Sequence, residues 1–350
     1  MKTRIIIVML MMMLSSGFSV KADTYWDYGA APDNSWFNAT NWNPDGVPDA
    51  TTQVRIGTTT DPVQISGPGA VGNNVYVADL SSDQTVLNVS NTGSLTASAM
   101  IFAGLQGNGT INSSGTLTAN GFAIVVGQAP TANGTLRING GTVTSNFMYA
   151  GDWGSGLVEL NTGGNINLGG LMIIGGNSGA VGTVNINGGN SISQMVFMGD
   201  QGSGALNVAD GEIATIGGMV LAGWASATGV LNVTGGHVNI GDFLFVGDKG
   251  AGDASLDGGV LTANWLQINA LSHMDITNGL LELRGDHLSD AALLGYMNNG
   301  FLTAYGQSGS QYFNMTYDGN ITSITAIPEP ASMMLLGIGL LVLRAKKNRK

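Results

Sequence analysis

The sequence predicts an all-β fold, a parallel β-solenoid with three faces and about 24 residues per coil. A recurring sequence motif ends with a glycine at intervals of 23 or 24 residues, at Gly104, Gly127, Gly151, Gly175, Gly199, Gly223 and Gly247. Each period holds three short apolar segments and no stretch of helical periodicity. A fixed period of this length is typical of stacked supersecondary units.

The first segment of each period alternates apolar and polar residues, as in "GTLRINGG" (134–141) and "GVLNVTGG" (229–236). This alternation predicts a strand with one buried face. The expected inward pairs are Leu136/Ile138, Val158/Leu160, Val184/Ile186, Leu206/Val208 and Leu231/Val233. Between them, Asn185, Asn207 and Asn232 point outward, where we expect them to stack as a ladder that stabilises the rod.

The second segment is shorter and has one central apolar residue, at Val143, Ile166, Ile192, Ile213, Val238 and Leu261. The third segment leads into the closing glycine, and its outward positions are apolar as well: Phe102, Val125, Tyr149, Ile173, Phe197, Leu221 and Phe245. Strands that are buried on both faces have this pattern. We therefore expect a cover on the third face, either the segment after residue 275 or another molecule.

Coils of this kind rise by one strand spacing, roughly 4.8 Å, so about eight coils between residues 80 and 270 predict a rod of roughly 40 Å. The alternative fold is a sandwich of short antiparallel strands. The constant spacing argues against it, because hairpin loops rarely keep one length.

Both flanks of the repeats differ from the solenoid. Residues 1–22 have a basic start, an apolar run and small residues at the end, which predicts a signal peptide for export. Residues 23–80 are expected to form an N-terminal capping region and the first coil, residues 81–275 the solenoid repeats, and residues 276–326 a C-terminal cap with one short helix. Ser289 is the expected N-cap of that helix, and Gly300 lies just past its end.

Three of the six tryptophans lie in the N-terminal region, at Trp26, Trp36 and Trp42. We interpret them as a core that caps the first coil, because a rod end exposes unpaired strands. The alternative is a sugar-stacking platform, in which Trp36 and Trp42 contact a glycan.

Charge limits the function. Residues 23–326 carry four basic and 22 acidic side chains, a formal charge of −18. Such a body repels nucleic acid, which excludes it as a partner. Solenoid enzymes that cleave acidic polysaccharides need basic residues near a carboxylate cluster, and this chain has few. The three histidines lie in unrelated contexts and the chain has no cysteine, so the sequence predicts no catalytic residues, metal site or cofactor.

The aspartates Asp152, Asp200 and Asp248 follow the closing position in every second coil. Two coil rises separate neighbouring members by about 10 Å, too far to share one Ca²⁺ ion. We therefore expect them to stabilise turns.

The last segment, Ala331 to Leu343, has 13 apolar residues, fewer than the roughly 17 to 25 of a comfortable membrane-spanning helix. A basic cluster follows at Arg344, Lys346, Lys347, Arg349 and Lys350, and it would hold the end of the segment on the cytoplasmic side. These features predict a short C-terminal transmembrane helix.

Pro328-Glu329-Pro330, the apolar run and the basic cluster, in this order, resemble the PEP-CTERM sorting signal of exported Gram-negative bacterial proteins. In that family an exosortase, a membrane-embedded cysteine protease, recognises the tripeptide and removes the tail, and the systems are associated with exopolysaccharide and biofilm. The glycine-rich repeats resemble autotransporter-passenger-like solenoids. The resemblance implies signal peptidase, the export machinery and an exosortase as partners, transient residence in the inner membrane, and a final place at the cell surface or outside the cell.

Two classes of function follow. The first is a non-enzymatic structural protein of the cell surface or extracellular matrix, whose rod presents repetitive faces to exopolysaccharide or to other copies of itself. The second is a glycan-binding adhesin or polysaccharide-active enzyme on a solenoid scaffold. The scarcity of basic residues and histidine favours the first class.

Overall fold

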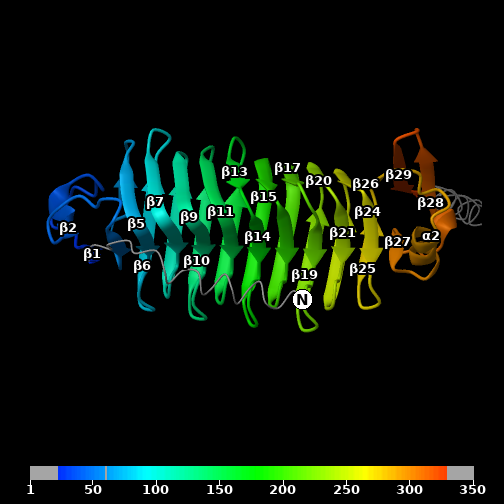
Figure 1. The fold of residues 1–350 in the computed structure, drawn as a ribbon, viewed down its shortest axis with the longest axis horizontal. Helices are drawn as coiled ribbons and strands as arrows, with labels where there is room; N and C mark the ends of the chain where they lie inside the picture. Colours follow the sequence, from blue (N-terminus) through cyan, green and yellow to red (C-terminus); the bar gives the residue numbers. More distant parts are fainter. Residues whose placement is uncertain (1–22, 60, 329–350) are drawn as a thin grey trace, which may run out of the picture.

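The computed structural model describes residues 23–59 and 61–328; the expected signal peptide and the tail from residue 329 lie outside this range. The described chain forms a rod of about ten parallel β-coils with a cap at each end (Figure 1). Successive coils pair strand on strand along the rod axis, and almost all of these pairings are parallel. The prediction of an all-β parallel solenoid with about 24 residues per coil is confirmed.

Each coil contributes one strand segment to each of three faces. The first face holds β4 (Val63–Ile65), β6 (Gln84–Val89), β8 (Asn108–Ser113), β10 (Asn133–Ile138), β12 (Ser155–Leu160), β19 (Thr228–Val233), β22 (Ala251–Leu256), β25 (His273–Ile276) and β27 (Leu302–Ala304). The second face holds β13 (Asn165–Leu168), β20 (His237–Ile240), β23 (Val260–Ala263) and β26 (Leu280–Arg284). The third face holds β1 (Asp23–Trp26), β3 (Gln53–Ile56), β14 (Leu171–Ile174), β16 (Met195–Met198), β18 (Met219–Leu221), β21 (Phe243–Val246) and β24 (Trp265–Ile268).

Six longer strands bend around a corner and serve two faces. Two of them join the first face to the second, β15 (Val181–Ser193) and β17 (Ser203–Thr215). Four join the second face to the third, β5 (Ala70–Val77), β7 (Ser94–Ala103), β9 (Thr116–Val126) and β11 (Thr142–Ala150).

On the first face the register follows the sequence pattern. Leu136 of β10 pairs with Ile111 of β8 and Val158 of β12, and all three side chains are fully buried. The outward ladder is also present, because Asn207 donates through Nδ2 to Asn185 Oδ1 at 2.8 Å and accepts from Asn232 Nδ2 at 2.8 Å. The inward columns and the outward amide ladder are therefore confirmed.

On the second face, the expectation that Ile192 points inward is wrong. Ser191, not Ile192, pairs with Ile166 and Ile213, and Ile192 is 44% exposed. The register of β15 against β17 shifts between Ile186 and Asn190, at the glycine corner, and this shift turns Ser191 inward. The hydroxyl of Ser191 is buried without a hydrogen-bond partner in the described structure.

On the third face, the coil that contains β18 (Met219–Leu221) reaches its corner one residue before Gly223, the position that the repeating glycines predict. Ala222, with a φ of 53°, occupies the closing position, and its N–H donates to Met198 O at 2.8 Å. Leu221 therefore points inward and is fully buried, whereas Val220 takes the outward position between Phe197 and Phe245. The expectation that Leu221 faces outward is wrong.

Two caps close the ends of the rod. The N-terminal cap contains η2 (Ala39–Asn41) and β2 (Trp42–Asn43), and the C-terminal cap contains α2 (Ala291–Asn298), η3 (Ser310–Tyr312), β28 (Phe313–Tyr317) and β29 (Ile321–Ala326). The N-cap of α2 is Asp290 rather than Ser289, because Asp290 Oδ1 accepts from the backbone N–H groups of Ala292 and Leu293. Gly300 has a φ of +77°, as expected just past a helix end.

The C-terminal cap leaves most of the third face uncovered. Strand β29 pairs with the edge of β26, on the second face, and α2 reaches the third face only beside β24. The expectation that the segment after residue 275 covers the third face is therefore wrong. That segment closes the open end of the rod instead.

The closing glycines are needed both for their backbone angle and for space. Gly127 has a φ of +78°, and a Cβ there would lie 2.0 Å from Ser155 O of the next coil. Gly179 has a φ of +85° but nothing within 4 Å of an added Cβ. We expect Gly127→Ala to lower the free energy of unfolding by about 2 to 4 kcal/mol and Gly179→Ala by only about 1 kcal/mol, measured by urea unfolding of the full-length chain. Equal losses would contradict the steric role of the corner.

Candidate functional site

The expected sorting signal begins at the C-terminal end of the rod. The last backbone hydrogen bond of the cap runs from Ile327 N–H to Tyr312 O at 2.8 Å, and Ile327 is 43% exposed. Pro328, the first residue of the expected tripeptide, is exposed. Glu329, Pro330 and the basic cluster lie outside the described residues. The tripeptide therefore starts directly after the final contact of the cap, at the end opposite the N-terminal cap (Figure 1).

The tryptophans proposed as a glycan platform are buried. Trp36 and Trp42 are both 0% exposed, and their rings pack edge to face with centroids 4.8 Å apart. Trp42 Nε1 donates to Trp36 O at 2.8 Å, and the Trp26 ring packs edge to face against Trp42 with centroids 5.0 Å apart. The hypothesis that Trp36 and Trp42 contact a glycan is therefore wrong, because the two rings form the core of the N-terminal cap.

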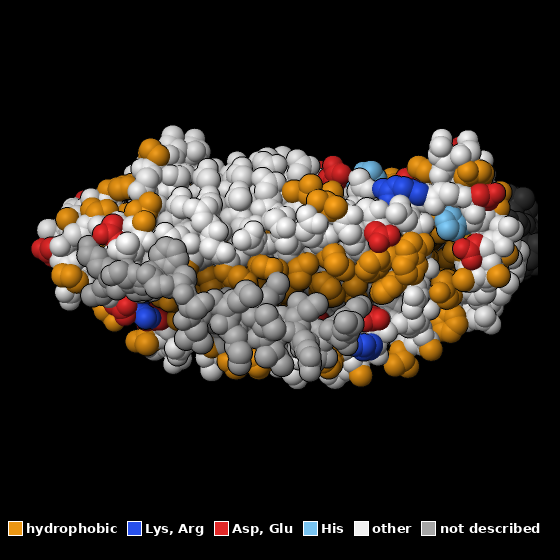
Figure 2. Space-filling view, viewed as in Figure 1, with side chains coloured by type: hydrophobic (Ala, Val, Ile, Leu, Met, Phe, Trp, Pro, Cys, Tyr) orange, Lys and Arg blue, Asp and Glu red, His pale blue; other side chains and the backbone are white. Residues whose placement is uncertain are grey.

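The third face carries a continuous row of outward apolar side chains, one per coil. The row contains Tyr76, Phe102, Val125, Tyr149, Ile173, Phe197, Val220 and Phe245. A space-filling view shows an apolar band along the rod (Figure 2). At one end of the row, the rings of Tyr76 and Phe102 stack at 5.1 Å with an interplanar angle of 18°. This face therefore provides a largely apolar surface along the described rod.

A corner row of aspartates lies beside this apolar row. Asp152 accepts hydrogen bonds from Gln128 Nε2 and Asn177 Nδ2, both at 2.8 Å, from the coils before and after it. Burial raises the pKa of Asp152 despite these two bonds. Burial also raises the pKa of Asp200, an effect that Lys249 opposes. At Asp152 the carboxylate thus bonds to side chains of both neighbouring coils.

The histidines lie on different elements and have separate partners. His237 Nε2 lies 3.4 Å from Thr262 Oγ1, and His273 Nε2 lies 2.9 Å from Thr303 Oγ1. Across residues 23–59 and 61–328, no three His, Cys, Asp or Glu side chains come together in a way that could hold a metal ion. In the same residues, no helix has the length and apolar character needed to cross a membrane.

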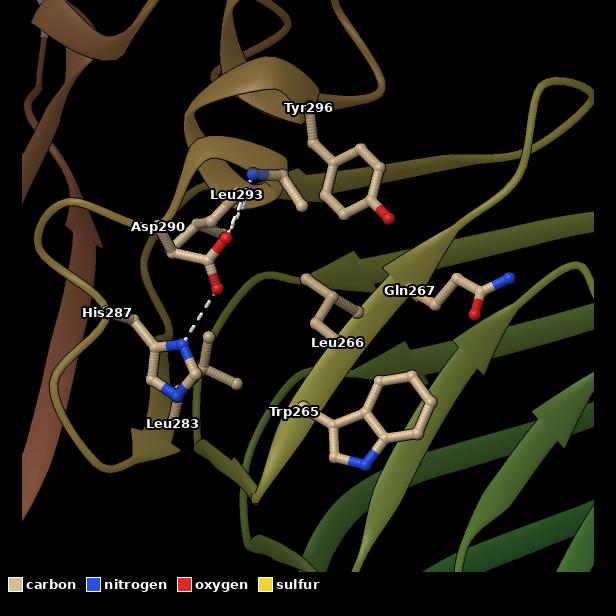
Figure 3. A pocket seen from close by; sticks show the side chains of 9 residues that line it. Trp265, Leu266, Gln267, Leu283, His287, Asp290, Leu293 and Tyr296 are labelled. Carbon is tan, nitrogen blue, oxygen red and sulfur yellow. Dashed lines mark hydrogen bonds and ion pairs between the residues drawn. The ribbon is translucent and has the colours of Figure 1, made fainter.

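A pocket of about 220 Å³ lies where the C-terminal cap meets the third face (Figure 3). Its apolar base is formed by Leu266, Leu283 and Leu293, which are at most 9% exposed. Trp265 and Gln267 line it from β24, and Tyr296 lines it from α2.

A hydrogen-bonded pair forms one wall of the pocket. His287 Nδ1 lies 3.1 Å from Asp290 Oδ2, while His287 Nε2 lies 3.1 Å from Arg284 O. The hydrogen bond from His287 lowers the pKa of Asp290. This pair joins the N-terminus of α2 to the end of β26 and so fixes the wall. The sequence did not reveal the pocket, because residues on a repeat strand and on the cap helix meet only in three dimensions.

Tyr149, in the outward row of the third face, provides a test of the packing there. Burial, assisted by the negative charges of Asp152 and Asp200, raises its pKa from 10 to about 12. The folded state therefore favours the neutral phenol, and the stability that this contributes is lost as the pH rises from 10 towards 12. Between pH 9 and 11.5 the wild type should lose about 2 kcal/mol more unfolding free energy than Tyr149→Phe in urea titrations.

The matched control for this prediction is Tyr317→Phe. Tyr317 is 37% exposed and lies on β28 of the C-terminal cap, away from the third face. This variant should lose as much stability as the wild type over the same pH range. Identical pH profiles for the wild type and Tyr149→Phe would contradict the burial of Tyr149.

Comparison with known proteins identifies the tail. Residues 326–350 match the model of the PEP-CTERM protein-sorting motif, whereas no curated protein and no solved structure matches the chain. The motif implies export, passage through the membrane and sorting by an exosortase, with the cell surface as the destination. The chain is thus a β-solenoid protein that carries a PEP-CTERM sorting motif at residues 326–350.

Proposed function

We propose that this protein is a non-enzymatic structural component of the cell surface or extracellular matrix, associated with exopolysaccharide or biofilm. The observation that carries the proposal is the position of the tail. The sorting motif follows directly on β29 at one end of a rod that is capped at the other end. A rod of about ten coils, roughly 50 Å long, then extends away from the membrane while the tail is inserted.

The outer surface of the rod supports this role. The same side-chain type recurs from coil to coil, as in the ladder of Asn185, Asn207 and Asn232 and in the apolar row of the third face. A repetitive surface suits contact with a repetitive polymer, or with neighbouring copies of the rod. The formal charge of −18 over residues 23–326 favours partners without negative charge.

The proposed sorting step predicts the fate of a tail variant. Replacing Pro328-Glu329-Pro330 with three alanines should leave the tail attached in the native host, because the exosortase recognises the tripeptide. Intact-mass measurement of the membrane and surface fractions would show this, and removal of residues 1–22 would confirm that the variant had still been exported. Normal removal of the tail from the variant would contradict the proposed signal.

The structural role requires a separate test in the same host. A deletion strain should form a matrix with lower cohesion in shear assays, and the wild-type gene should restore it. The three-alanine tail variant should fail to restore it even when it is exported in equal amount. A matrix that is unaffected by the deletion would overturn the structural role and leave the sorting assignment intact.

A further inference from the structure

We propose that the pocket between β24 and α2 binds one ring of an uncharged sugar, as part of a glycan. A sugar ring combines apolar C–H faces with a rim of hydroxyl groups. A site for it needs an aromatic or apolar surface beside a few hydrogen-bonding groups that are not already paired. The pocket meets both needs, and it lies away from the buried tryptophans of the N-terminal cap.

The unpaired polar groups come from three side chains. Among the described residues, the Tyr296 hydroxyl and Trp265 Nε1 have no hydrogen-bond partner. Gln267 uses its Nε2 to donate to Asn269 Oδ1 at 3.0 Å, and this leaves its Oε1 free to accept. In Figure 3, the Tyr296 side chain extends from α2 towards β24, whereas the Gln267 side chain and the Trp265 ring extend from β24 on the side that faces away from the helix. The residues that line the pocket thus carry one hydroxyl, one N–H donor and one carbonyl acceptor that have no partner among the described residues.

The size and base of the pocket indicate a small ligand group with an apolar face. Its volume of about 220 Å³ is below the roughly 300 to 1,000 Å³ of sites for drug-sized ligands. Leu266, Leu283 and Leu293 provide an apolar base, and Trp265 is 39% exposed at the rim. A single six-membered ring with its hydroxyl groups fits this description better than a nucleotide or a flat cofactor.

The charges around the pocket select an uncharged ring. Among the residues that the structure describes, no Lys or Arg side chain lines the pocket, so these residues offer no Lys or Arg counter-ion to a sulfate, phosphate or uronate group. Its carboxylate, Asp290, is already bonded to His287 and to the backbone N–H groups of α2. The surrounding body has a formal charge of −18 and repels anionic sugars further.

The pocket also has room for a longer glycan on one side. Trp265 and Gln267 pair in register with Phe243 and Phe245, so the pocket continues onto the apolar row of the third face. The Phe243 and Trp265 rings lie 5.6 Å apart. Further rings of a bound chain would therefore lie along aromatic side chains rather than in solvent.

The test uses soluble oligosaccharides and the full-length chain in a sugar-free detergent. The probes are cello-, laminari-, malto- and chito-oligosaccharides, with oligogalacturonate as an anionic comparison, and calorimetry gives the affinities. We expect at least one uncharged series to bind saturably and oligogalacturonate to bind at least tenfold more weakly. Trp265→Ala should lower the affinity at least tenfold, and Tyr296→Phe, which removes only a hydroxyl, about threefold to tenfold.

The matched control is Trp224→Ala. Trp224 is 45% exposed and lies at a solenoid corner under Lys249, so its loss removes an exposed indole away from the pocket. This variant should bind as the wild type does. The proposal is overturned if no uncharged series binds saturably, if Trp224→Ala and Trp265→Ala lose affinity equally, or if Tyr296→Phe leaves the affinity unchanged while its circular dichroism matches the wild type.

Discussion

Parallel backbone pairing between successive coils is the constraint on which the rest of this structure depends. The strands of the coils donate and accept hydrogen bonds along the rod axis, so a residue within a strand stacks on its counterpart in the next coil. Apolar and polar residues alternate along each strand. Because the coils stack in register, the apolar residues form buried columns, such as Leu136 on Val158, and the polar residues form outward rows, such as Asn185 on Asn207. Amide side chains then extend the hydrogen bonding outside the backbone.

The same pairing makes the two ends the vulnerable points of the rod, because a terminal coil exposes unpaired backbone groups. At one end, three packed tryptophans lie over the first coils. At the other, β29 pairs antiparallel with β26, and α2 packs beside β24. The C-terminal cap has two further roles. The sorting motif continues from its end at Pro328, and the cap forms one wall of the pocket beside Trp265.

Local pattern predicted most of the solenoid, because strand alternation and glycine corners act within one coil. The local pattern predicted the wrong direction for a side chain where a coil contains one residue more or fewer between two corners. Ile192 is more apolar than Ser191, yet the register shift after Ile186 places the serine inside. Ala222 adopts the positive φ that glycine has in neighbouring coils. The spacing of the glycines therefore predicted an outward Leu221, whereas this side chain is buried.

The functional residues were less predictable than the fold, for a physical reason. The sequence around Trp36 and Trp42 fits either a core or a ligand platform, and only the complete burial of the two rings in the folded cap decides between them. The pocket was not predicted at all, because it depends on how a cap helix lies against the last strand of a repeat face. The sorting motif was the exception, since its features are contiguous in sequence and need no tertiary structure.

The parallel stacking of coils is tested most directly by measuring how the distance between two outward residues increases with the number of coils between them. The chain has no cysteine, so pairs of introduced cysteines can carry spin labels without further changes. Thr110, Ala205, Val230 and Asp253 occupy one outward row of the first face, and the last three lie four, five and six coils from Thr110. The parallel solenoid predicts mean distances of about 19, 24 and 29 Å from Thr110, a constant increment of one strand spacing. Distances that do not increase by about 4.8 Å per coil would contradict the parallel stacking.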